Sequence, residues 1–239
     1  MTEFNLRLKA SVDANKFRYG YPWIYSNEII SDRRTKSLLP GSFCKLVDYN
    51  KNPICLVTVN PKSKIFARVM DFNLETTVDA CWLKDKISKA LAKRKEIFRD
   101  PFYRLVNAEA DELPGLIVDR FDNVIVMQPN AFWAENMSEI IANSIKEVCS
   151  IDVVIKNASG RSRRLEGLDD KNSVFFGDLP EAAISVPMNG AIYKADVHEG
   201  QKTGLFYDQR QNHKFVASLA SGKTVLDVFC HVGGFGLAA

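Results

Sequence analysis

The 239-residue chain is 46% hydrophobic and 26% charged, a composition that is ordinary for a globular protein and excludes an intrinsically disordered one. No apolar run approaches the roughly 18 residues of a membrane-spanning helix, and the N-terminus lacks the charged-then-apolar layout of a secretory signal. The formal net charge is +3, and residues 1–75 hold 12 Lys and Arg against 7 Asp and Glu, which favours a polyanionic partner for this region.

The cysteines indicate a reducing compartment. An odd number of widely spaced cysteines without a Cys-x-x-Cys pair favours reduced, mostly buried thiols over a disulfide framework or a zinc site. We therefore expect a cytoplasmic protein without a bound metal. The five residues are Cys44, Cys55, Cys81, Cys149 and Cys230.

Residues 1–75 are predicted to form a small β domain. Short apolar segments at 43–47, 54–59 and 65–70 are separated by clusters rich in Pro, Gly and Asn. Strands so closely spaced, each followed by a turn signal, indicate a compact barrel or sandwich.

An aromatic stretch at 18–25 precedes these strands and has cations within it and nearby. Aromatic rings interleaved with cations can stack bases and contact phosphates, so RNA binding is one interpretation. In the other interpretation Trp23 and Tyr25 fill the barrel while the cations are solvated. The candidate RNA-binding residues are Lys9, Lys16, Arg18, Tyr21 and Trp23.

Residues 76–190 are predicted to form a central α+β domain. Apolar residues recur at three- and four-residue spacing in two segments, and β-branched runs flank Asp122-Asn123 and Asn189-Gly190. Asn-Gly is the stronger hairpin signal, because both of its residues readily adopt positive φ. The expected elements are helices at 82–98 and 133–148 and strands at 116–121, 124–128, 153–156, 184–188 and 191–197.

Three arginines lie close together between Gly160 and Gly167. Guanidinium groups match phosphate oxygens in a bidentate manner, so Arg161, Arg163 and Arg164 are further candidates for RNA contact. A solvated loop is the commoner outcome for such a sequence, and both interpretations stay open.

The closing stretch has the pattern of a nucleotide-type cofactor site. Residues 224–229 are predicted to form a buried parallel strand, followed by a turn containing Gly233, Gly234 and Gly236 and then a helix start. With one strand and no neighbour, its apolar side chains are expected to be disordered or packed on another chain. Before it, Asp208 is predicted to cap a helix, since Gln211 follows three residues on.

Two common phosphate-binding motifs are excluded. Lys202-Thr203 resembles the end of a Walker loop, but Gln201 stands directly before the lysine where that loop needs glycine. The glycine turn also lacks the Gly-x-Gly-x-x-Gly spacing of a dinucleotide site.

Six stretches together resemble the landmarks of one family. They are Tyr21-Pro-Trp-Ile-Tyr-Ser26, Asn60-Pro-Lys-Ser-Lys-Ile-Phe-Ala-Arg68, Leu113-Pro-Gly-Leu-Ile-Val-Asp-Arg120, Glu199-Gly-Gln-Lys-Thr-Gly204, Asp208-Gln-Arg210 and Val225-Leu-Asp-Val-Phe-Cys-His-Val-Gly-Gly-Phe235. The first two look like its PUA domain. The family is the S-adenosylmethionine-dependent methyltransferases that modify cytosine C5 of 23S ribosomal RNA.

This resemblance implies a multidomain protein with an all-β PUA-like RNA-binding barrel at 1–75, a central α+β domain at 76–190 and the start of an α/β Rossmann-like methyltransferase domain at 191–239. It implies S-adenosylmethionine as cofactor and ribosomal RNA as partner, with neither DNA nor a membrane; a homodimer stays open. The implied cofactor-binding residues are Lys202, Thr203, Gly204, Asp208, Gln209, Arg210, Asp227, Phe229, Gly233 and Gly234.

The family segments that hold the target base and supply a cysteine nucleophile have no counterpart up to Ala239. Cytosine C5 becomes nucleophilic only after a thiolate adds at C6, so we expect this chain alone to be inactive and to contain no catalytic residue. Cys230 lies beside the glycine turn without a neighbouring base and is not expected to replace that nucleophile. The alternative is a non-enzymatic RNA-binding protein that retains the PUA and central domains.

Overall fold

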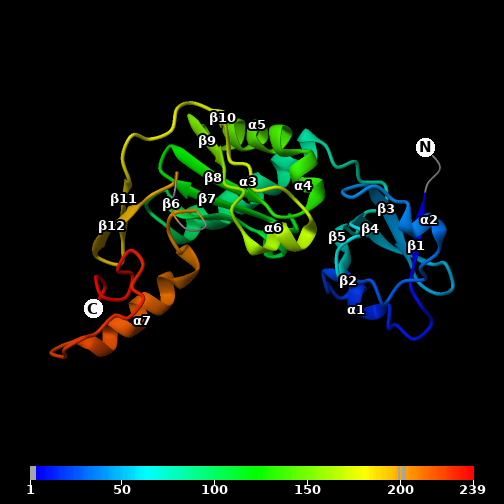
Figure 1. The fold of residues 1–239 in the computed structure, drawn as a ribbon, viewed down its shortest axis with the longest axis horizontal. Helices are drawn as coiled ribbons and strands as arrows, with labels where there is room; N and C mark the ends of the chain where they lie inside the picture. Colours follow the sequence, from blue (N-terminus) through cyan, green and yellow to red (C-terminus); the bar gives the residue numbers. More distant parts are fainter. Residues whose placement is uncertain (1–3, 199, 201–202) are drawn as a thin grey trace.

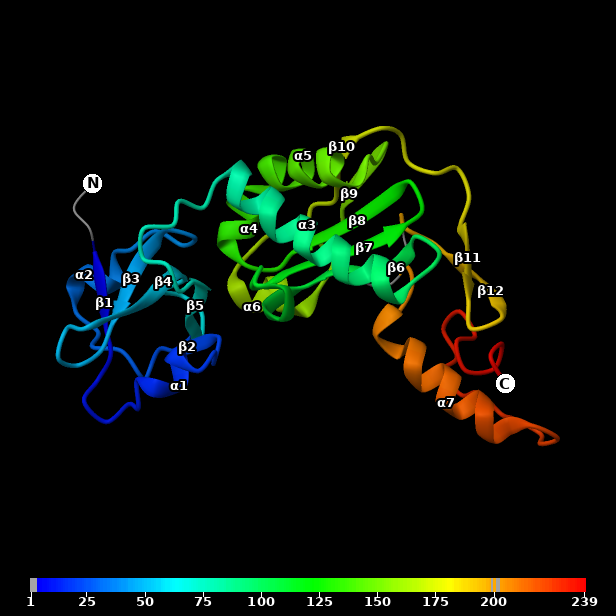
Figure 2. The same ribbon diagram turned by 180° about the vertical axis from the view of Figure 1, so that it is seen from behind.

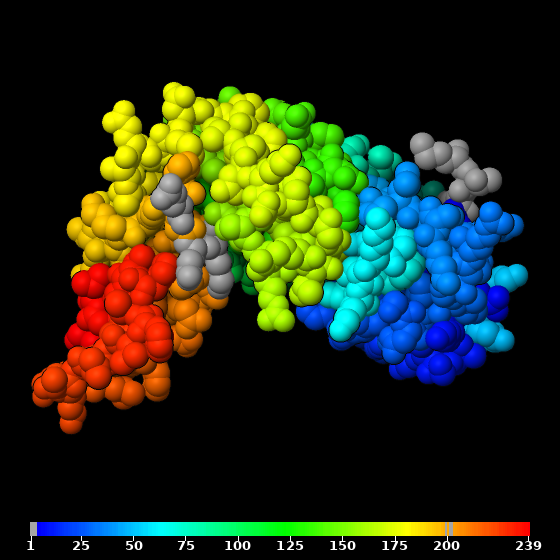
Figure 3. Space-filling view, viewed as in Figure 1, coloured from blue at the N-terminus to red at the C-terminus, as the bar shows by residue number. Residues whose placement is uncertain are grey.

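The computed structural model describes residues 4–198, 200 and 203–239, and it shows an elongated molecule with three parts in chain order (Figure 1). A small β part lies at one end and a larger α/β part in the middle. Helix α7 (Arg210–Ala220) and the residues after it protrude at the other end, which the space-filling view also shows (Figure 3). Within these described residues, no helix is both long and apolar enough to cross a membrane.

The first part is built on a five-stranded sheet with strand order β1-β3-β4-β5-β2. β1 pairs with β3 in parallel, and the other neighbours are antiparallel. Just beyond β1, Leu8 forms an antiparallel bridge with Ile29, which joins the two edges of the sheet and curls it towards the predicted barrel. The elements are β1 (Asn5–Arg7), α1 (Asn15–Arg18), β2 (Trp23–Tyr25), α2 (Arg33–Lys36), β3 (Phe43–Val47), β4 (Pro53–Val59) and β5 (Ile65–Asp71).

The three longer strands of this sheet confirm the segments predicted at 43–47, 54–59 and 65–70. β1 and β2 have only three residues each and no counterpart among the predictions. Their apolar residues nevertheless complete the core, where Leu6, Ile24 and Leu46 are fully buried. Burial of such side chains is the main source of stability in a domain of this size.

The middle part has a second five-stranded sheet, with order β10-β9-β8-β7-β6. Only β8 and β9 are parallel, and two helices between them make the crossover that parallel pairing requires. The elements are α3 (Ala80–Ile97), β6 (Phe102–Asn107), η1 (Ala108–Asp111), β7 (Leu116–Phe121), β8 (Val124–Pro129), α4 (Phe132–Asn136), α5 (Ser138–Cys149), β9 (Val153–Lys156), α6 (Arg161–Glu166) and β10 (Ser173–Phe176).

Both faces of this sheet are covered. Helices α3 and α5 pack together on one face (Figure 2), where Leu83, Ile87 and Trp133 are fully buried. The hairpin of β11 (Ile184–Met188) and β12 (Ala191–Ala195) packs on the other face through Tyr193. The turn of this hairpin is the predicted Asn-Gly pair, with φ values of 54° and 81°. Both predicted hairpins are confirmed, since β7 and β8 also pair antiparallel around Asp122-Asn123.

A buried carboxylate connects the first part to the second. Glu166, at the end of α6, accepts hydrogen bonds from Asn60 Nδ2 at 2.7 Å, Ser63 Oγ at 3.1 Å and Arg68 Nη2 at 2.6 Å. Its side chain is 5% exposed and that of Arg68 is 12% exposed. The indole of Trp23 and the second arm of Arg68 both bond Glu109 Oε1, at 2.8 and 3.1 Å. These bonds fix the orientation of the barrel relative to the central sheet.

The structure corrects two predictions near the C-terminus. Residues 224–229 form no strand, because a strand needs a hydrogen-bonded neighbour and the described residues offer none at this place. Their side chains are largely exposed, completely so for Phe229. Asp208 does not cap α7: it lies inside η2 (Tyr207–Gln209), and Gln209 occupies the N-cap position without a side-chain bond. The short 3-10 turn therefore takes the place of a capping box.

Candidate functional site

The glycine turn near the C-terminus closes over a cavity of about 150 Å³, which we call the glycine-turn pocket. Its wall comes from the segment before α7, from α7 and from the turn itself. Most of the lining is apolar or aromatic, with one carboxylate and two imidazoles. Gln209, His213, Asp227, Phe229 and Gly234 are among the lining residues.

Asp227 is the acidic group of this pocket. Its Oδ2 accepts a hydrogen bond from the Gly236 N–H at 2.9 Å, and so it fixes the end of the turn. Among the described residues, Oδ1 accepts no hydrogen bond. Asp227 can therefore offer one oxygen to a ligand donor, such as an amino or hydroxyl group, while the other maintains the turn.

His213 forms the floor of the pocket and explains one of the glycines. A Cβ at Gly234 would lie 2.5 Å from two atoms of the imidazole, so any larger residue would displace either the glycine turn or the His213 ring. The rings of Tyr193 and Phe235 lie 6.3 and 4.5 Å from the imidazole, centroid to centroid. His213 Nδ1 is buried and has no partner among the described residues. A buried polar atom of this kind calls for a partner, and the pocket is where a ligand can supply one.

Titration of His213 should appear in the stability of the protein. Burial lowers the pKa of His213 from its ordinary 6.5, and Asp227 and Asp208 oppose this. Below about pH 6.5 the unfolded chain therefore binds more protons than the folded one, and stability falls as the pH drops through that value. We expect denaturant midpoints measured from about pH 8 to 5 to fall less steeply for His213→Gln than for wild type. The exposed His198→Gln is the matched control, and a slope in His213→Gln equal to wild type would contradict the effect.

The predicted cofactor residues are divided between several places. Gln209, Asp227, Phe229 and Gly234 line the glycine-turn pocket, and Gly233 lies in its turn. Asp208 and Arg210 line a different cleft. Lys202 lies outside the described residues.

Thr203 and Gly204 are buried in the fold. Thr203 Oγ1 donates to Asp119 Oδ2 at 2.6 Å, and a Cβ at Gly204 would lie 2.4 Å from the carbonyl oxygen of Asp196. Asp119 is fully buried and also accepts bonds from Arg104 Nε and Nη2, at 2.9 and 3.2 Å. Thr203 thus positions the backbone that leads to the pocket. The sequence hints at Asp119, since a carboxylate interrupts an apolar strand, but not at its partner Arg104.

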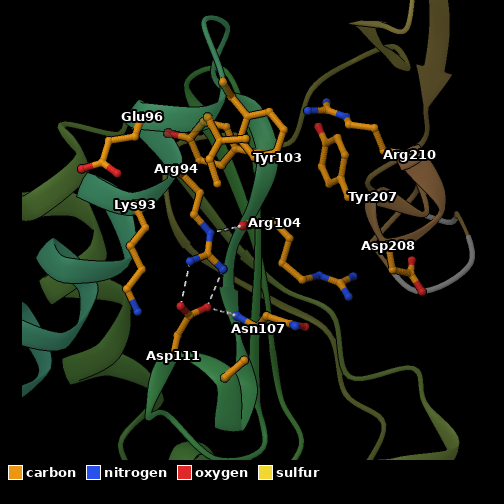
Figure 4. A pocket seen from close by; sticks show the side chains of 13 residues that line it. Lys93, Arg94, Glu96, Tyr103, Arg104, Asn107, Asp111, Tyr207, Asp208 and Arg210 are labelled. Atoms are coloured by element: carbon orange, nitrogen blue, oxygen red, sulfur yellow. Dashed lines mark hydrogen bonds and ion pairs between the residues drawn. The ribbon is translucent and has the colours of Figure 1, made fainter. Parts of the chain in front are cut away.

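A larger cleft of about 560 Å³ lies between the end of α3, β6 and the start of α7 (Figure 4). Arg94 is fixed from behind by a bidentate pair with Asp111, at 2.7 and 2.5 Å. Arg104 is fixed by Asp119, and the figure shows Tyr207 and Arg210 facing Tyr103 across the cleft. The cleft is therefore rigid, cationic and partly aromatic.

The predicted RNA-binding residues of the barrel have mixed surroundings. Lys9 is exposed, and Lys16 pairs with Glu28 while its Nζ lies 4.9 Å from the centre of the Tyr21 ring. Arg18 Nη2 lies 3.4 Å from Asp48 Oδ2, and the arginine side chain remains partly exposed. These residues stay candidates. Trp23 instead lies at the interface with the central part, because its indole bonds Glu109.

Residues 161–166 form helix α6 and not the solvated loop of one interpretation. The prediction that Arg163 contacts RNA is also wrong. Arg163 is 1% exposed and donates to Glu135 Oε2 at 2.7 Å and to the carbonyl oxygen of Pro129 at 2.5 Å. Its guanidinium is committed to the interior, so it does not contact RNA. Arg161 and Arg164 point outward from the same helix and remain predicted RNA contacts.

The cysteines differ in burial and therefore in reactivity. Burial raises the pKa of Cys44 and Cys55 to about 12 and that of Cys149 to about 11, which suppresses the thiolate. Cys81 and Cys230 are exposed. Over the residues that the structure describes, no group of three or more His, Cys, Asp or Glu side chains is arranged to hold a metal ion.

Comparisons with known proteins connect these features. Residues 6–72 match the family model of a PUA-like domain. The chain is 33% identical over 222 residues to a protein of Shewanella frigidimarina named "Ribosomal RNA large subunit methyltransferase I", covering 92% of this chain and 56% of that protein. It is 32% identical over 247 residues to a Deinococcus radiodurans protein named "Ribosomal RNA large subunit methyltransferase", covering 98% and 59%.

Solved structures show the same fold. A proposed SAM-dependent methyltransferase from Streptococcus mutans superposes with a TM-score of 0.81 at 17% identity, covering 98% of this chain and 60% of that one. A crystal structure described as a proposed methyltransferase complexed with SAH gives 0.80 at 17%, covering 100% and 59%. The chain spans a little over half the length of the relatives that it matches. Residues 6–72 are thus similar to a PUA-like domain, and nearly the whole chain is similar to part of proteins named as large-subunit ribosomal RNA methyltransferases.

Proposed function

We propose that the protein to which these residues belong transfers a methyl group from S-adenosylmethionine to C5 of a cytosine in 23S ribosomal RNA. The observation that carries this proposal is the match at 31–33% identity, over more than nine-tenths of the chain, to proteins named ribosomal RNA large subunit methyltransferases. The PUA-like match at 6–72 supports RNA as the partner. Cytosine C5 comes from the resemblance of the sequence motifs.

The glycine-turn pocket fits part of the cofactor. Ligand sites commonly enclose about 300–1,000 Å³, and the pocket encloses about 150 Å³. The free Oδ1 of Asp227, the amide of Gln209 and the unpartnered Nδ1 of His213 are polar groups suited to the amino and hydroxyl groups of S-adenosylmethionine. When bound, that cofactor supplies a methyl group on a sulfonium, which a nucleophilic carbon can attack. The role of these residues is to bind and orient it.

The nucleophile that activates cytosine is not assigned to these residues. Three of the five cysteines are buried with raised pKa values, which is the opposite of what thiolate attack needs. Cys230 lines the pocket, but among the described residues its thiol forms one hydrogen bond, to the carbonyl oxygen of His231 at 3.9 Å, and none to a base. We accordingly give the described residues roles in binding RNA and in holding part of the cofactor.

Three domains follow from this proposal, at 1–75, 76–190 and 191–239. The exposed cations of the first domain, together with Arg161 and Arg164 of α6, are proposed to contact RNA phosphates. The alternative of a non-enzymatic RNA-binding protein keeps these contacts and dispenses with the cofactor.

Deleting the gene that encodes this chain should remove one 5-methylcytidine from 23S ribosomal RNA, as measured by mass spectrometry of nuclease digests. A wild-type copy should restore the modification. A copy with Asp227→Asn should restore much less, because it neutralises the carboxylate of the pocket, whereas the exposed Asp178→Asn should restore it fully. Unchanged RNA after deletion would support the non-enzymatic alternative, and loss of a methyl group elsewhere than on cytosine would reject the cytosine assignment.

A further inference from the structure

Two clefts meet at Arg210. One is the cleft of Figure 4, and the other, also of about 560 Å³, lies between the end of α3 and the β11–β12 hairpin. They share Ile97, Phe98 and Arg210 as lining residues. Together they make a continuous surface, which we call the arginine groove, on the part of the molecule away from the barrel.

The Arg210 guanidinium is rigidly placed at this junction. Nη2 donates to the carbonyl oxygen of Phe102 at 2.5 Å, and the central carbon lies 4.6 Å from the Phe98 ring centre and 5.4 Å from that of Tyr207. The Asn189 side chain ties the hairpin to the same place by donating to the Arg210 carbonyl oxygen at 2.8 Å. The position of the charge is thus determined by three separate segments.

This cation lacks a direct counter-ion in the part of the chain that is described, and the nearby Asp100 favours its charge only at longer range. Arg210 forms no ion pair there, and its Nε is buried without a hydrogen-bond acceptor. Burial lowers the pKa of Arg210, the sign of an environment that disfavours its charge. A guanidinium remains charged in proteins, so a partly buried, unpaired one calls for an anion.

Further cations line the groove on both sides of Arg210, and on the side shown in Figure 4 they are accompanied by the carboxylates of Glu96, Asp111 and Asp208. Arg99 and Lys214 line the hairpin side, and Lys93 lines the other side. All three are exposed, and none forms an ion pair among the described residues. On the hairpin side the charged lining residues are Arg99, Arg210 and Lys214 against one acid, Asp100. The charge is spread along the groove rather than gathered around one point.

The edges of the groove are apolar and open. Ile97 is 68% exposed and Ile192 is 66% exposed, and they border the hairpin side from α3 and β12. Exposed aliphatic side chains beside cations can bind a polymer in which flat, apolar groups are joined by anionic linkages. Single-stranded RNA has this chemistry, since its bases can cover apolar side chains while its phosphates meet the cations.

We propose that the arginine groove binds the backbone of single-stranded RNA, with the Arg210 guanidinium at one phosphate and Arg99 and Lys214 at its neighbours. This inference rests on the proposed function, from which RNA is the partner, and adds to it a second contact surface remote from the PUA-like barrel. Arg210 then binds RNA, rather than the cofactor as the sequence motif implies.

The test is fluorescence anisotropy with a fluorescein-labelled single-stranded RNA oligonucleotide over a series of salt concentrations. Arg99→Gln combined with Lys214→Gln should weaken binding roughly tenfold at low salt and reduce the slope of log K against log salt by about 1.4, or about 0.7 for each phosphate that is no longer neutralised. The matched control combines Lys146→Gln with Lys171→Gln, two exposed lysines outside the groove, and should behave as wild type. Arg210→Lys should also weaken binding, because lysine cannot reproduce the stacked planar group.

Three results would count against the groove. Wild-type affinity and slope in Arg99→Gln/Lys214→Gln, with weakened binding in Lys9→Gln/Lys16→Gln, would overturn the groove and leave the proposed function standing. Displacement of the labelled RNA by uridine monophosphate alone at matched ionic strength would make it a mononucleotide site instead. Absence of RNA binding by wild type at low salt would overturn the groove and the proposed RNA partner together.

Discussion

Replacing Glu166 with alanine should lower the free energy of unfolding by about 3 kcal/mol, because it removes the buried carboxylate from one arm of the Arg68 guanidinium and leaves only Glu109 on the other arm. The same change removes the acceptor of Ser63 and one of the two acceptors of Asn60, which keeps the backbone carbonyl oxygen of residue 166 at 2.9 Å. Urea denaturation measures the energy. Small-angle X-ray scattering should show a broader range of shapes, since these bonds fix the two parts to each other.

The control for this change is Glu112→Ala. Glu112 pairs with Lys86, but its side chain is 67% exposed. Exposed pairs contribute at most about 1 kcal/mol, so this variant should stay close to wild type in energy and in scattering. Equal stabilities of Glu166→Ala and Glu112→Ala would show that the interface depends on apolar contacts instead.

Replacing Asp119 with alanine should have a comparable effect, about 3–5 kcal/mol, since it leaves the largely buried Arg104 guanidinium without its paired carboxylate. It also releases Thr203, whose hydroxyl is bonded to the same carboxylate. We therefore expect faster proteolytic cleavage near residue 203 in addition to a lower denaturant midpoint. The cleavage rate reports on the loss of the Thr203–Asp119 hydrogen bond, whereas the denaturant midpoint reports on the stability of the whole protein.

Thr203→Val is the matched variant for that test. It keeps the shape of the side chain and the Asp119–Arg104 pair and removes one hydrogen bond, which is worth about 1 kcal/mol. It should speed cleavage near residue 203 with little effect on the global midpoint. If Asp119→Ala unfolds at the wild-type midpoint, the buried pair is not the anchor that its geometry indicates.

The features that the sequence predicts well depend on neighbouring residues. Asn189-Gly190 and Asp122-Asn123 mark their hairpins because turn geometry is a local property, and the strands beside them follow. β1 and β2 are not predictable in this way. Each has three residues, and each becomes a strand only because β3 or β5 supplies its hydrogen bonds.

The sequence does not predict which polar and charged side chains are buried with a distant partner. Arg163 has the sequence context of an exposed phosphate-binding residue, and it is buried because Glu135, 28 positions earlier, lies within 2.7 Å of it. Nothing in the local sequence signals that partner. The same reason applies to Trp23, whose indole finds Glu109 across the domain interface.

The sequence predicts the glycine turn of the candidate site, but it does not predict that the motif residues line two separate cavities. Gln209 and Arg210 are adjacent in sequence, yet they line different cavities, because side chains at consecutive positions of a helical turn point about 100° apart. A motif that looks like one binding segment therefore serves two surfaces. The strand predicted at 224–229 fails for the opposite reason, since its residues are suitable but no neighbouring strand lies beside it among the described residues.

The Glu166 connection has a geometric consequence for the RNA binding that we propose. The barrel lies at one end of the molecule and the β11–β12 hairpin at the other (Figure 1), with the central sheet packed between them. Because the polar bonds of Glu166 hold the barrel in one orientation, the separation between the two ends is already fixed in the protein alone. An RNA that touches both must already have the matching bend and spacing or adopt them on binding. The fixed distance between the two ends can then select an RNA by its three-dimensional shape, without contacts that recognise individual bases.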